Sequence, residues 1–192
     1  MNRSVRMLVF VALLGTFTSI LLLGMNQLTD ARIEANEEAL LRSQVLDGFD
    51  IDYTDTNINT VFNKNVTIQT IDEYTFYLYE ETGELTFRFE GGGVWGPIIG
   101  LLTLEPDLET IEYITILEQE ETPGLGGVVA ERPYLSKFVD KVMTIDITKS
   151  ADMSTNSEVD AITGATRTSD AFETILNSTY ETVIPLWEDT QE

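Results

Sequence analysis

The sequence predicts an α+β fold: one N-terminal transmembrane helix, followed by a single extracytoplasmic domain with a mostly antiparallel sheet and flanking helices. Two observations lead to this prediction. An uncharged apolar run, Met7–Met25, is long enough to span a bilayer. Strand-like segments gather in the middle of the chain, and helix-like segments lie towards both ends. A length of 192 residues suits one domain with a membrane segment attached.

Composition excludes several kinds of chemistry. The chain has 33 acidic and 11 basic side chains and a net charge of −22, which repels nucleic acid, so no nucleic-acid partner is expected. The acidity predicts a solvated surface, and a docking face for a basic partner is the alternative. Without Cys or His, the chain lacks thiolate ligands and the commonest general base, so we predict no catalytic residue and no metal site. Redox chemistry would need an organic cofactor.

The apolar run predicts a retained membrane anchor. A cleaved signal peptide is the alternative, but it would have a shorter apolar region and a small-x-small cleavage site, whereas this run ends in Leu22-Leu23-Gly24. Arg3 and Arg6 precede the run and mostly acidic residues follow it. The positive-inside rule therefore predicts a single-pass protein of the cytoplasmic (inner) membrane, with its N-terminus in the cytoplasm and its main domain outside.

Four parts are predicted in order: a cytoplasmic N-terminus (1–6), a transmembrane anchor (7–25), a stalk helix and linker (26–60), and the extracytoplasmic domain (61–192). Within the third part, Ile33, Leu40, Leu41 and Val45 have helical spacing and predict a helix over Thr29–Leu46, capped by Thr29 or Asp30. Asp47-Gly48 ends this helix, and the polar stretch up to Thr60 is predicted to be a loop.

Four strands are predicted in the middle of the chain: Tyr74–Tyr79, Leu85–Glu90, Ile98–Leu104 and Ile111–Leu117. The first two are rich in aromatic residues and flank a Gly-containing turn, which indicates a hairpin. In the second strand, Leu85, Phe87 and Phe89 share one face. A short helix over Leu135–Val142, a strand over Met143–Ile147 and a helix over Asp170–Asn177 complete the prediction, and Tyr180 continues the apolar spacing of the last helix.

Two glycine-rich loops are candidate parts of a binding site. In Gly91–Pro97, the glycines allow either a tight turn with Trp95 in the core or a backbone surface against a flat ring with Trp95 beside it. Glu121–Gly127 contains a Pro-Gly pair typical of a type II turn, and its glycines also allow a close approach of the backbone.

The segment Asp160–Ser169 is the most informative of the chain. It places hydroxyls and a Gly-Ala pair directly before a predicted helix, and a helix start with unpaired N–H groups attracts phosphate. Thr168, Ser169 or Asp170 would also cap this helix, with Glu173 at capping-box spacing from Asp170. Capping by these residues leaves Thr166 available, so the segment can be both a capped helix start and a phosphate site.

The pattern Asp-x-x-Thr-Gly-Ala-Thr at Asp160–Thr166 resembles the flavin attachment motif of the FMN-binding domain family. The Glu-Thr-Pro-Gly-Leu-Gly run at Glu121–Gly126 resembles a second segment of that family, in the expected order. Over residues 5–182 the chain is similar to the RnfG component of Rnf electron-transport complexes and to the related NqrC component of sodium-translocating NADH:quinone reductases. Gly93–Pro97 and Leu104–Asp107 favour the reductase component, whereas chain length favours the Rnf component.

The resemblance implies FMN attached by a phosphoester bond to Thr166, with Arg167 and the helix start near the phosphate. It implies contacts to the flavin ring from Trp95, Glu121, Thr122 and Leu125. The remaining residues that we assign to the cofactor site are Asp160, Thr163, Gly164, Ala165, Thr168, Ser169, Gly124 and Gly126.

The resemblance further implies an electron-transfer subunit of an ion-translocating membrane complex of the Rnf (ferredoxin:NAD oxidoreductase) type, without complete enzyme activity by itself. Its partners would be the other subunits and a flavin transferase that uses FAD and Mg2+. Three alternatives stay open: the NqrC component of a sodium-translocating NADH:quinone reductase, a stand-alone anchored flavoprotein that serves another reductase, and an acidic anchored domain without a cofactor.

Overall fold

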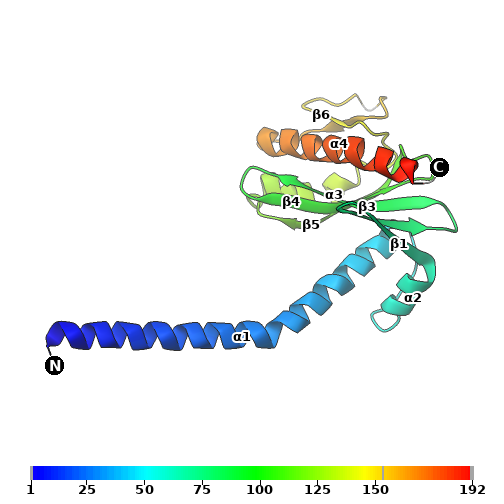
Figure 1. Cartoon of the computed structure of the whole chain (residues 1–192). Coiled ribbons are helices and arrows are strands. Elements are labelled where there is room, and N and C mark those ends of the chain that lie inside the picture. Colours follow the sequence, from blue (N-terminus) through cyan, green and yellow to red (C-terminus); the bar gives the residue numbers. More distant parts are fainter. Residues whose placement is uncertain (1, 153, 191–192) are drawn as a thin grey trace. The chain divides into compact units, whose positions relative to one another are not determined.

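The computed structural model describes residues 2–152 and 154–190. The chain divides into two compact units, Met1–Leu40 and Leu41–Glu192. Helix α1 (Arg3–Gly48) forms the first unit and continues into the second (Figure 1). The continuous helix replaces the two helices predicted from the sequence, so a helix cap at Thr29 or Asp30 is wrong.

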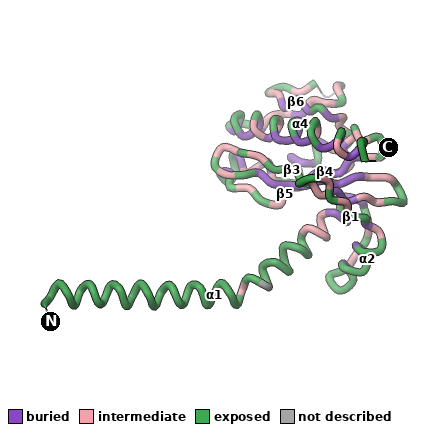
Figure 2. The backbone as a smooth tube through the Cα atoms, viewed as in Figure 1, coloured by how far each residue is buried: buried purple, intermediate pink, exposed green. Residues whose placement is uncertain are grey.

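The first unit holds helix α1 up to Leu40, and nearly all of its described residues are exposed (Figure 2), including its large apolar ones. Leu22, for example, is 67% exposed. The hydroxyls of Thr16 and Thr18 donate hydrogen bonds to the carbonyl oxygens of Ala12 and Leu14, one turn earlier, so they need no outside partner. By length and composition, α1 is the one helix of the described residues that could cross a membrane. The predicted N-terminal apolar helix is confirmed.

The second unit is an α+β domain around an antiparallel sheet. Its elements after α1 are α2 (Ile58–Asn65), β1 (Val66–Ile71), β2 (Tyr74–Tyr79), β3 (Glu84–Gly92), β4 (Pro97–Leu104), β5 (Ile111–Gln119), the 3-10 helix η1 (Gly126–Ala130), α3 (Arg132–Leu135), β6 (Asp146–Thr148), β7 (Glu158–Asp160) and α4 (Thr166–Asp189). Strands β1 to β5 pair in sequence order, each antiparallel to its neighbour, and β6 pairs with β7 in parallel. The predicted α+β class with a mostly antiparallel sheet is confirmed.

Apolar clusters cover both faces of the sheet. On one face, helix α4, η1 and α3 pack over the strands, and the rings of Phe172 and Phe89 lie 6.0 Å apart. On the other face, Val45 and Leu46 at the end of α1 join α2 in a smaller cluster that includes Leu101. Strand β4 is therefore buried on both faces, which explains its uninterrupted apolar sequence.

The predicted hairpin is confirmed, with one difference on its second strand. Leu85, Phe87 and Phe89 are fully buried on one face, as the alternation predicts. Thr86, on the opposite face of the strand, is also buried, because the smaller cluster covers that face. Its hydroxyl is satisfied by a hydrogen bond of 2.7 Å with the hydroxyl of Thr103.

The stretch before the sheet contains more regular structure than its polar composition predicts. Helix α2 begins within the predicted loop, and strand β1 was not predicted. Ile58 and Phe62 lie one helical turn apart and bury their side chains in the smaller cluster. Burial of these two side chains offsets the poor helix propensity of their polar neighbours. Residues 41–60, predicted as stalk and linker, also pack within the second unit.

The predicted helix over Leu135–Val142 is wrong. Helix α3 ends at Leu135, and the chain continues in turns, in which the Lys137 and Phe138 N–H groups donate to carbonyl oxygens three residues earlier. At the end of the segment, the Ile111 N–H donates to the Lys141 carbonyl oxygen, and the Asp140 N–H donates to the Ile111 carbonyl oxygen. These two bonds tie the segment to β5, so the backbone cannot continue as a helix. The strand predicted at Met143–Ile147 begins later, at Asp146, and pairs with β7, which was not predicted.

Candidate functional site

Three loops that are far apart in the sequence meet around one cavity of about 350 Å3, which we call the three-loop cavity. The loops are the β3–β4 turn, the segment between β5 and η1, and the segment between β7 and α4. The lining residues are Val94, Trp95, Glu121, Thr122, Leu125, Gly126, Gly164, Ala165, Thr166, Arg167 and Thr168. The structure therefore brings together the three segments that were singled out in the sequence.

The β3–β4 turn places Trp95 at the mouth of the cavity. Gly91 and Gly92 still belong to β3, and the Gly93 N–H donates to the Gly96 carbonyl oxygen to close the turn. Trp95 is 71% exposed, so its alternative placement in the core is wrong. An exposed indole beside a cavity is suited to cover a flat ligand.

The second loop supplies another exposed apolar side chain. The Thr122 carbonyl oxygen accepts hydrogen bonds from the N–H groups of Leu125 and Gly127, and Gly124 has a φ of +73°, so the loop is tightly folded. This folding leaves the Leu125 side chain 46% exposed at the cavity. Trp95 and Leu125 thus give the cavity two apolar walls.

The third loop leads into helix α4, which begins at Thr166 rather than at Asp170. Gly164 has a φ of +82°, and the Ala165 N–H donates to the Ile162 carbonyl oxygen, which turns the chain into the helix. Thr166 is thereby the first residue of a long helix, at the end where the helix dipole is positive.

The predicted caps of this helix are wrong. Ala165 occupies the N-cap position, and no side chain caps the helix there. Thr168, Ser169 and Asp170 lie inside the helix, because the helix starts earlier than its apolar spacing indicates. Since Ala165 offers no side-chain acceptor, the N–H groups at the helix start are not used by an N-cap side chain.

Burial separates the four hydroxyls of the predicted attachment segment into two classes. Thr163 and Thr166 are exposed, whereas Thr168 and Ser169 are buried. Thr168 Oγ1 donates to Glu121 Oε2 at 2.8 Å. Ser169 Oγ accepts the Ile162 N–H at 3.0 Å and donates to the Ala165 carbonyl oxygen. Of the two exposed hydroxyls, only that of Thr166 lies among the described lining residues of the cavity.

Four residues predicted for the site do not line the cavity: Asp160, Thr163, Gly124 and Ser169. Asp160 instead accepts the Ala151 N–H at 3.2 Å and lies 3.6 Å from Lys137 Nζ. Val94 lines the cavity and was missed. Its position between two singled-out residues, Gly93 and Trp95, was the available signal.

Arg167 is the cation nearest to the predicted attachment point in the sequence. Its side chain is exposed, and it forms no ion pair within the described residues. Together with the start of α4, it gives this end of the cavity donors for a phosphate group. The donor set and the two apolar walls fit a ligand with a phosphate at one end and a flat ring at the other.

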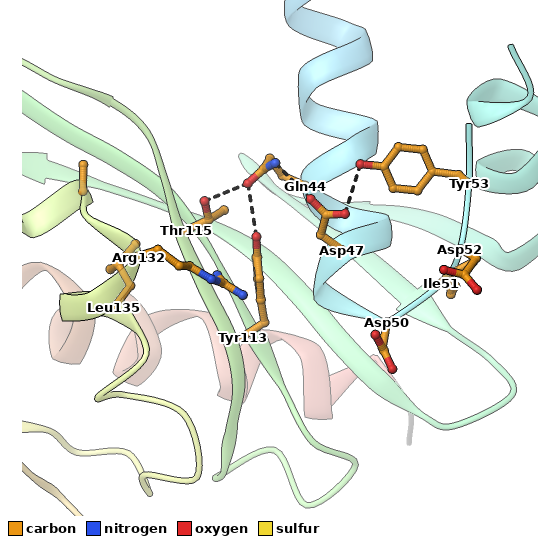
Figure 3. Close-up of a pocket in the computed structure, with 11 residues that line it drawn as sticks. Gln44, Asp47, Asp50, Ile51, Asp52, Tyr53, Tyr113, Thr115, Arg132 and Leu135 are labelled. Atoms are coloured by element: carbon orange, nitrogen blue, oxygen red, sulfur yellow. Dashed lines mark hydrogen bonds between the residues drawn. The ribbon is translucent and has the colours of Figure 1, made fainter. Parts of the chain in front are cut away.

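A larger cavity, of about 670 Å3, lies between the end of α1 and strand β5 (Figure 3). We call it the α1 groove. Several of its polar groups are paired with one another: Gln44 Oε1 accepts hydrogen bonds from Tyr113 and Thr115, and Asp47 Oδ1 accepts one from Tyr53. Burial, followed by this hydrogen bond, raises the pKa of Tyr53. No group of acidic residues suited to a metal ion occurs among the described residues.

The family comparison agrees with the three-loop cavity. Residues 93–181 belong to the FMN-binding domain family. This segment contains all three loops of the cavity, and the family predicted from the sequence is confirmed.

The chain is also similar to the C component (NqrC) of Na(+)-translocating NADH-quinone reductases. It is 35% identical to the protein of Neisseria meningitidis serogroup B over 94 residues, which cover 45% of this chain and 36% of the relative. Identity to the Haemophilus ducreyi protein is 33% over 96 residues, which cover 46% of this chain and 37% of the relative. The match thus spans little more than a third of the length of these relatives.

Two solved structures share the fold. Shewanella oneidensis NqrC superposes with a TM-score of 0.68 at 18% identity, covering 76% of this chain and 93% of that one. The corresponding component of the Na(+)-translocating NADH-quinone reductase from Parabacteroides distasonis gives a TM-score of 0.68 at 20% identity, covering 82% and 96%. The likeness therefore extends beyond the segment matched by the family.

Proposed function

We propose that this chain is an electron-transfer subunit of an ion-translocating membrane complex and carries FMN on Thr166 through a phosphoester bond. The observation that carries the proposal is the position of Thr166: an exposed hydroxyl on the first residue of α4, in the cavity formed by the three loops. Bound FMN accepts and donates one or two electrons. The family match supports FMN as the cofactor.

The residues of the chain hold, orient and shield this group. Thr166 tethers the phosphate, and the helix start and Arg167 offset its negative charge. Trp95 and Leu125 cover the ring, while the backbone at Gly164 allows a close approach, because it has no side chain there. A covalent link prevents irreversible loss of the cofactor outside the cell.

Attachment requires a separate flavin transferase. In that step the Thr166 oxygen bonds to the phosphorus of the FMN half of FAD, AMP leaves, and the hydroxyl proton passes to a base. The chain has no His or Cys to act as that base, which supports activation by the transferase.

The attachment is tested by co-expression of the full chain with a flavin transferase, followed by a denaturing gel under ultraviolet light. We expect a fluorescent band for the wild type and for Thr163→Ala, the matched exposed hydroxyl of the same loop, and no band for Thr166→Ala. A band with Thr166→Ala would exclude Thr166 as the attachment point. A colourless wild type would favour an anchored domain without a cofactor.

Two complexes are candidates for the assembly. The Rnf type is our first candidate from the sequence, and the similarity to named reductase relatives favours the NqrC component of a sodium-translocating NADH:quinone reductase. Purification of the membrane complex distinguishes them. Ferredoxin:NAD activity identifies the first and NADH:quinone activity the second, whereas a chain that purifies without other subunits is a stand-alone flavoprotein.

We further place the N-terminus in the cytoplasm and the domain outside, because Arg3 and Arg6 precede the apolar helix. The absence of Cys makes this easy to test. A membrane-impermeant maleimide should label intact cells that carry Asp55→Cys and should not label cells that carry Ser4→Cys. The reverse pattern would invert the topology.

A further inference from the structure

Glu121 is a buried carboxylate in the wall of the three-loop cavity. Its residue is 4% exposed, although acidic side chains are rarely so buried without partners. Glu121 Oε1 accepts the N–H groups of Val94 at 2.6 Å and Trp95 at 3.1 Å. Glu121 Oε2 accepts the Thr168 hydroxyl at 2.8 Å. One side chain therefore joins all three loops.

The packing around this carboxylate leaves it no freedom to turn towards a ligand. A Cβ atom at Gly126 would overlap Glu121 Oε2 and lie 2.7 Å from Thr168 Oγ1. A Cβ atom at Gly93 would lie 2.6 Å from Glu121 Oε1. The two glycines thus enclose the carboxylate from both sides. Since Oε1 already accepts two hydrogen bonds, its capacity is filled within the protein.

We propose that Glu121 is a positioning residue, which sets the distance between the Trp95 wall and the attachment helix and does not itself bind the flavin ring. This inference rests on the proposed function, and it replaces the ring contact predicted for Glu121 from the sequence. The bonds to Trp95 N–H and Thr168 act on the ring wall and on the first turn of α4, the turn that carries Thr166. A single carboxylate thereby aligns the two ends of the ligand site.

Loss of the Glu121 carboxylate should affect the shielding of the flavin ring but not the attachment of FMN. Thr166 keeps its hydroxyl when the carboxylate is removed, so FMN can still be attached to it. Without its acceptor, the Trp95 turn keeps the Gly93–Gly96 bond and the neighbouring strand pairs among the described residues. The ring of an attached flavin then gains access to water.

The experiment compares full-length wild type, Glu121→Leu, Glu121→Gln and Thr168→Val, each flavinylated by co-expression and purified in detergent. Iodide quenching of flavin fluorescence measures access of solvent to the ring, and visible circular dichroism measures its asymmetric surroundings. For Glu121→Leu and Thr168→Val, we expect the quenching constant to rise roughly twofold or more, because a loop that loses its tie opens locally at low cost. Glu121→Gln keeps an acceptor for the N–H groups of Val94 and Trp95, so its quenching constant should be close to that of the wild type.

Glu118→Gln is the matched control, because it removes an exposed carboxylate near the end of β5. It should leave quenching and circular dichroism unchanged. If Glu121→Leu and Thr168→Val both retain wild-type quenching with FMN attached, the positioning role is wrong. If Glu121→Leu does not fold, Thr168→Val decides alone, since it removes one oxygen from a side chain of the same shape. A wild type without covalent flavin would instead contradict the proposed function.

Discussion

The three-loop cavity and the α1 groove differ in how far their polar groups are already satisfied. The groove is almost twice as large, at about 670 Å3 against about 350 Å3, but Gln44, Asp47 and Tyr53 bond to protein groups within it. The smaller cavity combines an exposed hydroxyl and an uncapped helix start with two exposed apolar side chains. We therefore place the ligand site in the smaller cavity, because its exposed hydroxyl, helix start and apolar side chains together suit a ligand with a phosphate and a flat ring.

The largest expected effect on stability comes from a substitution in the wall of the three-loop cavity. Gly126→Ala places a methyl group against the Glu121–Thr168 hydrogen bond, where the side chains of Glu121 and Thr168 leave no room. We expect a loss of about 1–3 kcal/mol in the free energy of unfolding and a higher quenching constant of the attached flavin. Urea unfolding of the full chain in detergent measures the free energy of unfolding. Gly92→Ala, which meets open space, is the control and should cost less.

A smaller effect is expected in the α1 groove. Thr115→Val removes the hydroxyl that donates to Gln44 at 2.8 Å and should cost about 1 kcal/mol. Flavin attachment and quenching should not change, because the groove is a structural contact between α1 and the sheet. Altered flavin spectra in this variant would show that the two cavities are coupled.

Helix α3, which lines the groove, supplies a test that depends on pH. Leu135 lines the groove, whereas Tyr134 is 5% exposed in the core below α4, and its phenol oxygen has no hydrogen-bond partner among the described residues. Tyr134→Phe removes a buried polar atom without a partner and should stabilise the chain by about 1 kcal/mol near neutral pH. A loss of stability would indicate that the hydroxyl is bonded.

The raised pKa of Tyr134 predicts a loss of stability at high pH. Burial raises the pKa of Tyr134 above its ordinary value of 10.0. The folded state therefore binds the phenol proton more tightly than the unfolded state does, and this contribution is complete below pH 10 and decreases as the pH rises above it. Urea midpoints measured across this range should fall for the wild type, and Tyr134→Phe should reduce the slope.

The smallest effect on stability is expected at the mouth of the three-loop cavity. Trp95 is mostly exposed, so Trp95→Ala should change the free energy of unfolding by no more than about 0.5 kcal/mol. Its removal should nevertheless raise the quenching constant of the flavin, because one apolar wall is lost. Unchanged quenching would mean that Trp95 does not cover the ring.

Local patterns predicted the elements with the clearest aromatic or apolar sequences. The aromatic alternation of the β2–β3 hairpin and the apolar run of β4 place these strands almost as observed. Prediction failed at Leu135–Val142, where local turns end in backbone bonds from Asp140 and Lys141 to the distant Ile111. It also failed for the caps of α4, because apolar spacing marks the buried part of a helix and not its first turn.

The sequence by itself determined the apolar helix, the α+β class and the three segments from which the site is built, since each depends on neighbouring residues. Only the tertiary structure decided which hydroxyl is presented to the cavity. The motif resemblance points to Thr166, but the physical difference between Thr166 and Thr168 appears only in the structure: the carboxylate of Glu121, 47 residues before Thr168, accepts the Thr168 hydroxyl, whereas Thr166 stays exposed. That choice depends on a contact between distant residues, which forms when the loops are brought together around the cavity.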